Sequence, residues 1–207
     1  MFSFELRCGD KKCAALTLRF PGNHNVLNAS AALVVADVLG ISLLDASRAL
    51  STFNGTSRRF ELVSEVQGVT IISDYAHHPT EIMATLSAAR AYYPKRQLWA
   101  VWQPHTYSRV RMLFDEFAAA FQDADHVLIT EIYPAREPVD RSYSAKQFLD
   151  SMAHTDVSFQ PGSLEATDFL VNNIQYGDVV IVLSAGDADQ ICTHLVDALD
   201  QVLKENG

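Results

Sequence analysis

The pattern of apolar and polar residues begins with a segment typical of a β-hairpin. Residues alternate between the two types over Phe2 to Arg7 and again over Ala15 to Phe20, with a turn at Gly9-Asp10. Two helices are expected next, at about Asn25 to Leu39, closed by Gly40, and at about Leu43 to Phe53, capped by Ser42. The polar break Gly55-Thr56-Ser57 then predicts a linker, so we expect one domain over residues 1–55 and another over 56–207.

Beyond this break, apolar runs of strand length alternate with helical patterns. The predicted strands are Phe60 to Val66, Val69 to Ser73, Leu98 to Trp102, His126 to Thr130 and Val179 to Leu183. The predicted helices are Pro79 to Tyr92, Ser108 to Phe121, Ala145 to Met152, Ser163 to Asn173 and Ala188 to Leu203. Near-continuous apolar strands that alternate with helices predict an α/β fold with a mostly parallel open sheet and helices on both faces.

Composition narrows the classes of function. Acidic residues outnumber Lys and Arg by 25 to 16, and a net charge of −9 disfavours a nucleic-acid partner. No apolar run approaches the roughly 18 residues of a transmembrane helix, and the N-terminal residues do not resemble a signal peptide. The 3 cysteines form no CxxC pair, so we expect a reducing, cytoplasmic environment and no membrane insertion.

Specific polar loops follow four of the predicted strands. They are Asp74-Tyr-Ala-His-His-Pro-Thr-Glu81, Gln103-Pro-His-Thr-Tyr-Ser-Arg109, Glu131-Ile-Tyr-Pro-Ala-Arg-Glu137 and Ser184-Ala-Gly-Asp187. Ligands of open α/β sheets bind outside the carboxyl ends of the strands, so these loops should meet at one edge. Their carboxylate, imidazole and guanidinium groups predict a site for a charged small molecule, since arginine and helix N-termini bind anions.

Each of these loop residues also has a structural interpretation. Asp74 could only cap a turn, His105 could be a surface histidine, and Arg109 could decorate a helix face. The pair His77-His78 with His105 raises a metal hypothesis, which we disfavour because adjacent loop residues often face opposite ways. We therefore expect no metal site in this chain.

Two further groups of polar residues lie nearer the N-terminus. His24, Asn25 and Asn28 could present polar edges to a nucleobase, although turn and capping roles are the simpler interpretation. Arg58 and Arg59 could contact a phosphate or lie at a solvated strand end. The sequence contains neither GxxxxGK[ST] nor GxGxxG, so a phosphate cradle for any nucleotide is not in this chain.

In their order and spacing these motifs resemble the C-terminal half of the Mur ligases of peptidoglycan synthesis. The resembling stretches are Pro21 to Ala32, Thr56 to Phe60, Asp74 to Glu81, Gln103 to Arg109, Ile132 to Glu137 and Gly177 to Asp187. Gln-Pro-His-x-Tyr-x-Arg in the second loop favours the members that add L-alanine to UDP-N-acetylmuramate. The resemblance implies a remnant of a central ATP-binding domain followed by a Rossmann-like C-terminal domain. The N-terminal domain that holds the UDP-sugar and the central P-loop have no counterpart here.

The same resemblance implies chemistry and residue roles. A Mur ligase forms an amide through an acyl phosphate, using ATP and Mg²⁺, with the metal ligands expected in the missing central domain. The residues that match nucleotide contacts are His24, Asn25, Asn28, Arg58, Arg59 and, for the ribose, Asp74. The residues that match the catalytic wall are His77, His105 and Arg109, and those that match the amino-acid site are Tyr75, His105 and Arg109.

Two alternatives stay open on the sequence alone. The chain could be the C-terminal half of a murein-peptide ligase, which shares the Asp74 to Pro79 loop and takes an oligopeptide. It could also be a non-catalytic nucleotide-binding module of Mur ligase ancestry. A decayed site would be expected to lose Asp74, His105 or Arg109, and all three are present.

Overall fold

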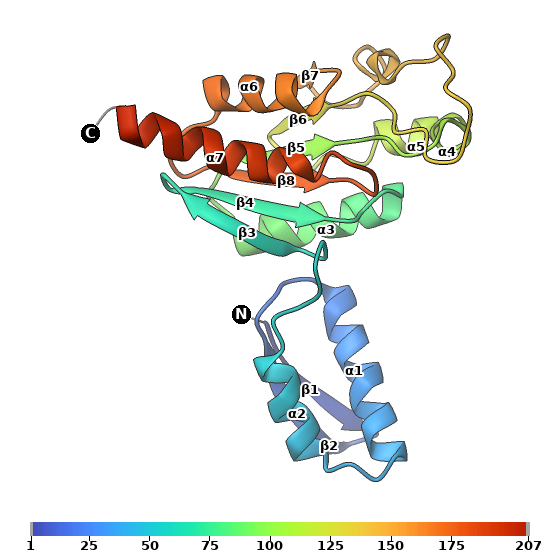
Figure 1. The fold of residues 1–207 in the computed structure, drawn as a ribbon. Coiled ribbons are helices and arrows are strands. Elements are labelled where there is room, and N and C mark those ends of the chain that lie inside the picture. Colours follow the sequence, from blue (N-terminus) through green and yellow to red (C-terminus); the bar gives the residue numbers. More distant parts are fainter. Residues whose placement is uncertain (1, 206–207) are drawn as a thin grey trace. The chain divides into compact units, whose positions relative to one another are not determined.

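The computed structural model describes the backbone of residues 2–205 and the side chains of residues 2–201. The chain divides into two compact units, one ending at Thr56 and the other beginning at Ser57 (Figure 1). Each unit has its own hydrophobic core and is described separately.

The first unit is a β-hairpin packed against two helices. Strands β1 (Phe2–Cys8) and β2 (Lys11–Leu18) pair antiparallel, and α1 (Asn23–Val38) and α2 (Leu43–Thr52) follow. The hairpin and both helices are therefore confirmed, with ends shifted by up to four residues. The predicted side-chain cap at Ser42 is wrong, because Ser42 precedes α2 without a hydrogen bond from its hydroxyl to the helix.

Helix α1 is apolar on nearly every side. Ala29 and Leu33 are buried against the hairpin, yet Leu27 is 71% exposed and Val38 is 80% exposed. A helix that is apolar all round is normally buried on all sides. The exposed side of α1 therefore has the character of an interior surface.

The second unit is built on one six-stranded sheet, in the order β3-β4-β8-β5-β6-β7. Its strands are β3 (Glu61–Val66), β4 (Val69–Asp74), β5 (Leu98–Trp102), β6 (His126–Ile129), β7 (Val157–Phe159) and β8 (Val179–Leu183). Only β3 runs antiparallel to its neighbour, so the prediction of a mostly parallel sheet is confirmed. The central strands β4, β5 and β8 are buried along their whole length, as continuous apolar runs require.

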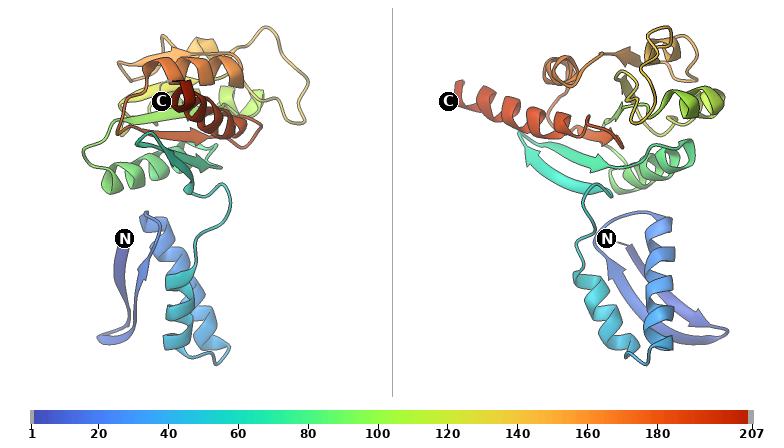
Figure 2. Two further views of the ribbon diagram at one scale, coloured as in Figure 1. Left: turned by 60° about the vertical axis from the view of Figure 1, so that its left-hand side comes forward. Right: turned by 45° about the vertical axis from the view of Figure 1, so that its right-hand side comes forward.

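Helices cover both faces of this sheet, as Figure 2 shows. The second unit contains α3 (Pro79–Tyr92), α4 (Tyr107–Met112), α5 (Phe114–Ala118), a 3₁₀ helix (Ala145–Phe148), α6 (Ser163–Asn173) and α7 (Gln190–Glu205). One core places α3, α4, α5 and the 3₁₀ helix around Trp102, and a second places α6 and α7 around Val180 and Val182. The predicted α/β fold with helices on both faces is confirmed.

Three predicted elements differ from the structure. The single helix expected over residues 108–121 is two short helices, because the chain leaves helical geometry at Leu113 (φ −116°, ψ 29°). The helix expected over 145–152 is a 3₁₀ turn that ends at Phe148, whose ring stacks on Phe114. Strand β7 was not predicted, because it has three half-buried residues and pairs only with β6.

The strand register brings four strand ends to one edge. Asp74 pairs with Leu183, Leu183 with Trp102, and Trp102 with Ile129, each across a parallel pair. The polar loops that follow β4, β8, β5 and β6 therefore leave the sheet side by side. Among the helices of residues 2–205, none has the length and hydropathy that crossing a membrane would need.

Candidate functional site

Strands β8 and β5 are neighbours whose connections leave in opposite directions. The chain leaves β8 into α7, which contacts β3 and β4, whereas it leaves β5 through α4 and α5 toward β6. Such a switch point opens a crevice at the carboxyl edge of the sheet. The loops that border it are the turn after β8 and the loop after β5.

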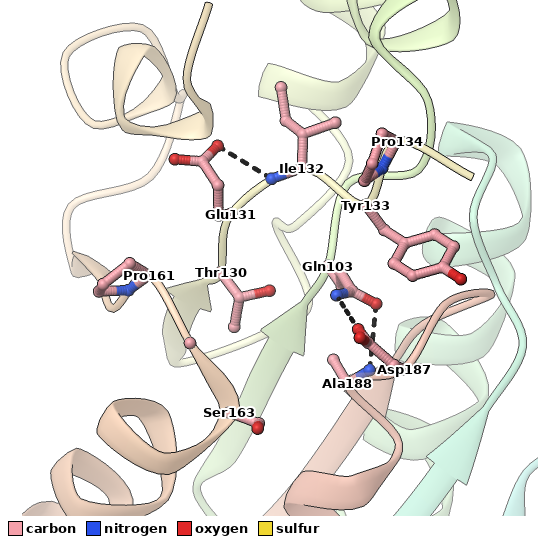
Figure 3. A pocket seen from close by; sticks show the side chains of 11 residues that line it. Gln103, Thr130, Glu131, Ile132, Tyr133, Pro134, Pro161, Ser163, Asp187 and Ala188 are labelled. Atoms are coloured by element: carbon pink, nitrogen blue, oxygen red, sulfur yellow. Dashed lines mark hydrogen bonds between the residues drawn. The ribbon is translucent and has the colours of Figure 1, made fainter. Parts of the chain in front are cut away.

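Gln103 joins these two loops through every polar atom of its side chain. Its Nε2 donates to Asp187 Oδ1 at 2.7 Å, and its Oε1 accepts from Ala188 N at 3.1 Å (Figure 3). The same Oε1 also accepts from Ser184 Oγ at 2.8 Å. The turn needs a glycine at position 186, since a Cβ there would lie 2.5 Å from Gln103 Oε1 and from Tyr133 Cγ. The sequence predicts no individual role for Gln103, because nothing in it reveals this cross-loop contact.

Arg58 also supports the turn after β8. Its Nη2 donates to the carbonyl oxygens of Ser184 at 2.6 Å and Gly186 at 3.2 Å, and its Nη1 lies 3.6 Å from Asp189. The neighbouring Arg59 is exposed and makes no hydrogen bond to the residues that the structure describes. Its guanidinium lies 5.4 Å from the ring centre of Tyr75, within the range of a cation–π contact. The two arginines therefore differ: Arg58 is committed to the fold and Arg59 is available.

Asp74 is 6% exposed at the end of β4. Its two carboxylate oxygens accept from the backbone N–H groups of Phe60 and Ala76, both at 2.8 Å. Burial raises the pKa of Asp74 above its ordinary value, and these two hydrogen bonds oppose the rise. Asp74 thus holds together the segment before β3 and the loop after β4, in agreement with the structural interpretation. The ribose contact remains a prediction.

The loop after β4 orients Tyr75 and His77. The Tyr75 N–H donates to the Arg58 carbonyl at 2.7 Å, and the Tyr75 carbonyl lies 2.8 Å from His77 Nδ1. Glu81 Oε2 accepts from the backbone N–H of His77 at 3.0 Å and lies 3.5 Å from its Nδ1. His78 instead caps α3, accepting from Thr80 N at 3.3 Å. The two adjacent histidines therefore have different roles.

His105 stands between the loops after β4 and β6. Its ring centre lies 5.6 Å from that of His77 and 5.7 Å from that of Tyr133, and its backbone forms a bridge to Tyr133. Arg109 Nη1 lies 3.1 Å from His105 Nδ1, one turn along the chain. Burial, the Arg109 charge and His77 lower the pKa of His105, so its imidazole is neutral near pH 7.

The structure thus brings together four predicted residues, Tyr75, His77, His105 and Arg109, in one row with Tyr133. Tyr133 belongs to the loop motif after β6, and the sequence predicts no role for it. Its position could have been inferred only from the pairing of β5 with β6. Arg109 keeps Nε and Nη2 without a partner among the described residues, so these donors can receive a carboxylate.

A cavity of about 390 Å³ adjoins this row on the side of β6 and α6 (Figure 3). It is lined by Gln103, Thr130, Glu131, Ile132, Tyr133, Pro134, Pro161, Gly162, Ser163, Asp187 and Ala188. Thr130 is 2% exposed, and its hydroxyl has no partner in the described part of the chain. Glu131 is oriented by the Ser144 hydroxyl at 2.7 Å and by the Ala145 N–H at 2.9 Å. The cavity therefore combines fixed carboxylates with a buried hydroxyl that has no partner among the described residues.

The remaining predicted residues lie in the first unit, at the start of α1. Asn25 Nδ2 donates to the Pro21 carbonyl at 2.6 Å, so part of its amide serves the turn before the helix. His24 and Asn28 are exposed and stand one helical turn apart. Their proposed nucleobase contact stays a prediction. Within residues 2–201, no three His, Cys, Asp or Glu side chains are grouped as a metal site would need.

A family model described as "Mur ligase, glutamate ligase domain" matches residues 58–186. UDP-N-acetylmuramate–L-alanine ligase of Acaryochloris marina is 43% identical over 190 residues, covering 87% of this chain and 39% of the relative. The ligase of the same name from Alkaliphilus metalliredigens is 40% identical over 195 residues, covering 94% of this chain and 42% of the relative. The chain thus spans about two fifths of the length of the curated relatives it matches.

Solved structures show the same likeness. The UDP-N-acetylmuramate–alanine ligase of Thermotoga maritima superposes with a TM-score of 0.79 at 29% identity, covering 93% of this chain and 41% of that one. A murein peptide ligase of Psychrobacter arcticus gives a TM-score of 0.65 at 29% identity, covering 95% and 42%.

Proposed function

This chain belongs to the Mur ligase family, and from that premise we propose that it is the C-terminal part of an ATP-dependent ligase. The ligase would join L-alanine to UDP-N-acetylmuramate through an acyl phosphate. The observation that supports this proposal most directly is the row of Tyr75, His77, His105 and Arg109 at the carboxyl edge of the sheet. Amide formation from an acyl phosphate requires alignment and charge neutralisation, which guanidinium and imidazole groups supply.

Within this function, Arg109 holds the alanine carboxylate through its free Nε–Nη2 edge. Tyr75 and His105 form the wall beside the acceptor, and the two imidazoles of His77 and His105 face the reacting amine and phosphoryl groups. Because each of these side chains is held by a backbone or side-chain partner, the site needs little reorganisation to bind.

We propose the nucleotide contacts for each unit by itself. Arg59 has a free guanidinium that fits a phosphate oxygen, whereas Arg58 is already bound to the turn after β8. His24, Asn25 and Asn28 are proposed on the adenine side. A ribose contact at Asp74 would have to use lone pairs that Phe60 N and Ala76 N leave free.

The described residues do not fit a Mg²⁺ site, because no carboxylate cluster is present among them. We therefore place the metal ligands, together with the P-loop, in a central domain outside this chain. The first unit would be the end of that domain. The apolar, exposed side of α1 supports this assignment. Large apolar residues such as Leu27 and Val38 are normally found on a helix face that other parts of a protein cover.

The test uses the full-length ligase that contains this chain. ATP-dependent phosphate release and product formation are measured with UDP-N-acetylmuramate and either L-alanine or a tripeptide as acceptor. Dependence on L-alanine supports the proposal, and this chain alone should form no product because it lacks a P-loop. Preference for the tripeptide would instead identify a murein-peptide ligase. A protein that turns over neither acceptor, and whose ATP binding is unchanged by Arg109→Ala, would instead be a non-catalytic binding module.

A further inference from the structure

The two imidazoles of the row carry their protons on different nitrogens. His77 Nδ1 lies 2.8 Å from the Tyr75 carbonyl, which only accepts, so Nδ1 is the protonated nitrogen. His105 Nδ1 lies 3.1 Å from Arg109 Nη1, which only donates, so this Nδ1 is the acceptor and the proton is on Nε2. When both rings are neutral, His77 therefore presents a lone pair at Nε2 and His105 presents an N–H at Nε2.

Neither Nε2 atom is completely buried. Neither atom has a hydrogen-bond partner among the described residues. The buried polar atoms of those residues that lack a partner do not include either Nε2. The His77 side chain is 22% exposed, and the two ring centres are 5.6 Å apart. The row thus offers a substrate a proton acceptor on one ring and a hydrogen-bond donor on the neighbouring ring.

We propose that His77 accepts through Nε2 a proton from the ammonium group of the acceptor amino acid, while His105 donates from Nε2 to the phosphoryl group. This inference rests on the proposed function, since that function supplies the acceptor and the acyl phosphate. The two histidines then have opposite roles, proton acceptor and hydrogen-bond donor. Neither the residue type nor the position in the sequence would tell these two roles apart.

The proton transfer balances as follows. An N–H bond of the ammonium breaks, its electron pair stays on nitrogen, and the proton bonds to His77 Nε2. The amine then bonds to the acyl carbon, and the bond from that carbon to the phosphate oxygen breaks with its electrons on the phosphate. The departing phosphate takes the second amine proton, and the imidazolium of His77 returns its proton to solvent. His105 stays neutral and only stabilises the negative charge of the phosphate.

Two groups lie next to Nδ1 of His77. The Tyr75 carbonyl remains hydrogen-bonded to Nδ1, and Glu81 lies 3.5 Å from that nitrogen. The other charged and titratable groups around the two rings are Arg58 and Arg59 over Tyr75, Tyr133 against His105, Arg109 on α4 and Glu137. Burial and then Arg109 lower the pKa of His105, and Arg109 already donates to its Nδ1, so we assign the role of proton acceptor to His77.

The first test is made on this chain by nitrogen NMR of the imidazoles at about pH 8.5, roughly two units above the ordinary histidine pKa of 6.5. His77 should show its proton on Nδ1 and His105 on Nε2, with the signals assigned by His77→Asn and His105→Asn. Arg109→Ala should remove the preference of His105 and leave that of His77 unchanged. A proton on Nε2 of His77, or on Nδ1 of His105, overturns the inference whatever the reaction of the full enzyme.

The second test measures kinetics of the full-length ligase. His77→Asn keeps a donor toward Tyr75 but accepts no proton, so kcat should fall at least about 100-fold with the alanine KM changed less than about threefold. The remaining rate should rise steadily with pH, because the free amine no longer needs a base. His78→Asn is the control, since an asparagine oxygen can still cap α3. A kcat within about threefold of the unmodified enzyme, or an unchanged pH profile, would overturn the role of His77.

Discussion

Arg58 and Arg59 are adjacent, carry the same charge and are expected to behave in opposite ways. Arg58 donates two hydrogen bonds to the carbonyls of Ser184 and Gly186, and its side chain is 26% exposed. Arg59 is exposed and has no hydrogen bond to the described residues. Replacing each in turn by alanine therefore separates a residue that stabilises the second unit from one that is free for a ligand.

The size of the Arg58 effect follows from its contacts. A hydrogen bond from a charged group contributes about 1.5–3 kcal/mol, and partial exposure places these two at the lower end, near 3 kcal/mol in total. The buried Nε of Arg58 has no partner in residues 2–201, and losing that unsatisfied donor offsets part of the cost. Arg58→Ala should thus lower the free energy of unfolding by about 2 kcal/mol. Alanine keeps the strain of the positive φ of 57°, so that strain does not enter the difference.

Urea unfolding of the chain, followed by tryptophan fluorescence, measures this loss. The chain has 2 tryptophans, Trp99 and Trp102, and both lie in β5, so the signal comes from the second unit alone. Arg59→Ala should change the free energy of unfolding by less than about 0.5 kcal/mol. An Arg58→Ala variant as stable as the unmodified chain, or an equal loss in Arg59→Ala, would refute the assignment of the two arginines.

Further changes test the site and its surroundings. In the full-length ligase, Arg109→Ala should raise the alanine KM roughly thirtyfold, because it removes a charge-assisted contact of about 2 kcal/mol. Arg109→Lys should recover only part of the lost affinity for alanine. An unchanged alanine KM would show that Arg109 does not belong to the site. Hydrogen bonds from the Ser142 hydroxyl and then from Arg111 lower the pKa of Asp140 to about 2. The Asp140 carboxylate therefore stabilises the folded state at pH values above the ordinary aspartate pKa, and this contribution is lost as the pH falls toward 2. Carboxyl NMR should show this titration, and Arg111→Ala should raise the pKa of Asp140. Burial raises the pKa of Cys192 to about 12, so iodoacetamide at pH 8 should leave it unmodified while the exposed Cys8 reacts.

The parts of the fold predicted from the sequence are those with strong local signals. Strands β5 and β8 and helices α3 and α6 agree with prediction to the residue, because each is a buried apolar run or a helix with a defined start. Other segments depend on distant contacts. Leu113 interrupts a helix that every local preference would continue.

Loop geometry was beyond local prediction for a related reason. Arg58, Phe60, Thr106 and Ala135 have positive φ although none is glycine. The Phe60 backbone is held by Asp74, and the Thr106 N–H donates to the Tyr133 carbonyl at 2.9 Å. At Phe60 and Thr106 the positive φ is accompanied by a tertiary hydrogen bond, which no residue-type rule would predict.

For the same reason, the sequence alone does not separate residues that bind a ligand from residues that hold the loops together. An aspartate, an arginine and a glutamine in strand-end loops are equally suited to binding a ligand and to binding the loops themselves. What separates them is the number of donors and acceptors left over after folding. Gln103 has donated and accepted at both ends of its amide, so it can hold the turn after β8 but has little to offer a substrate.

Among the described residues at this edge of the sheet, a smaller set of side chains keeps hydrogen-bonding atoms free for a ligand. Arg59 keeps its whole guanidinium, Arg109 keeps Nε and Nη2, and the two histidines each keep one nitrogen of opposite character. These groups are cationic or neutral, whereas Asp74, the predicted anionic member, is buried and already paired. The edge of the sheet is therefore suited to negatively charged groups, such as the carboxylate and the phosphoryl group that the proposed function requires.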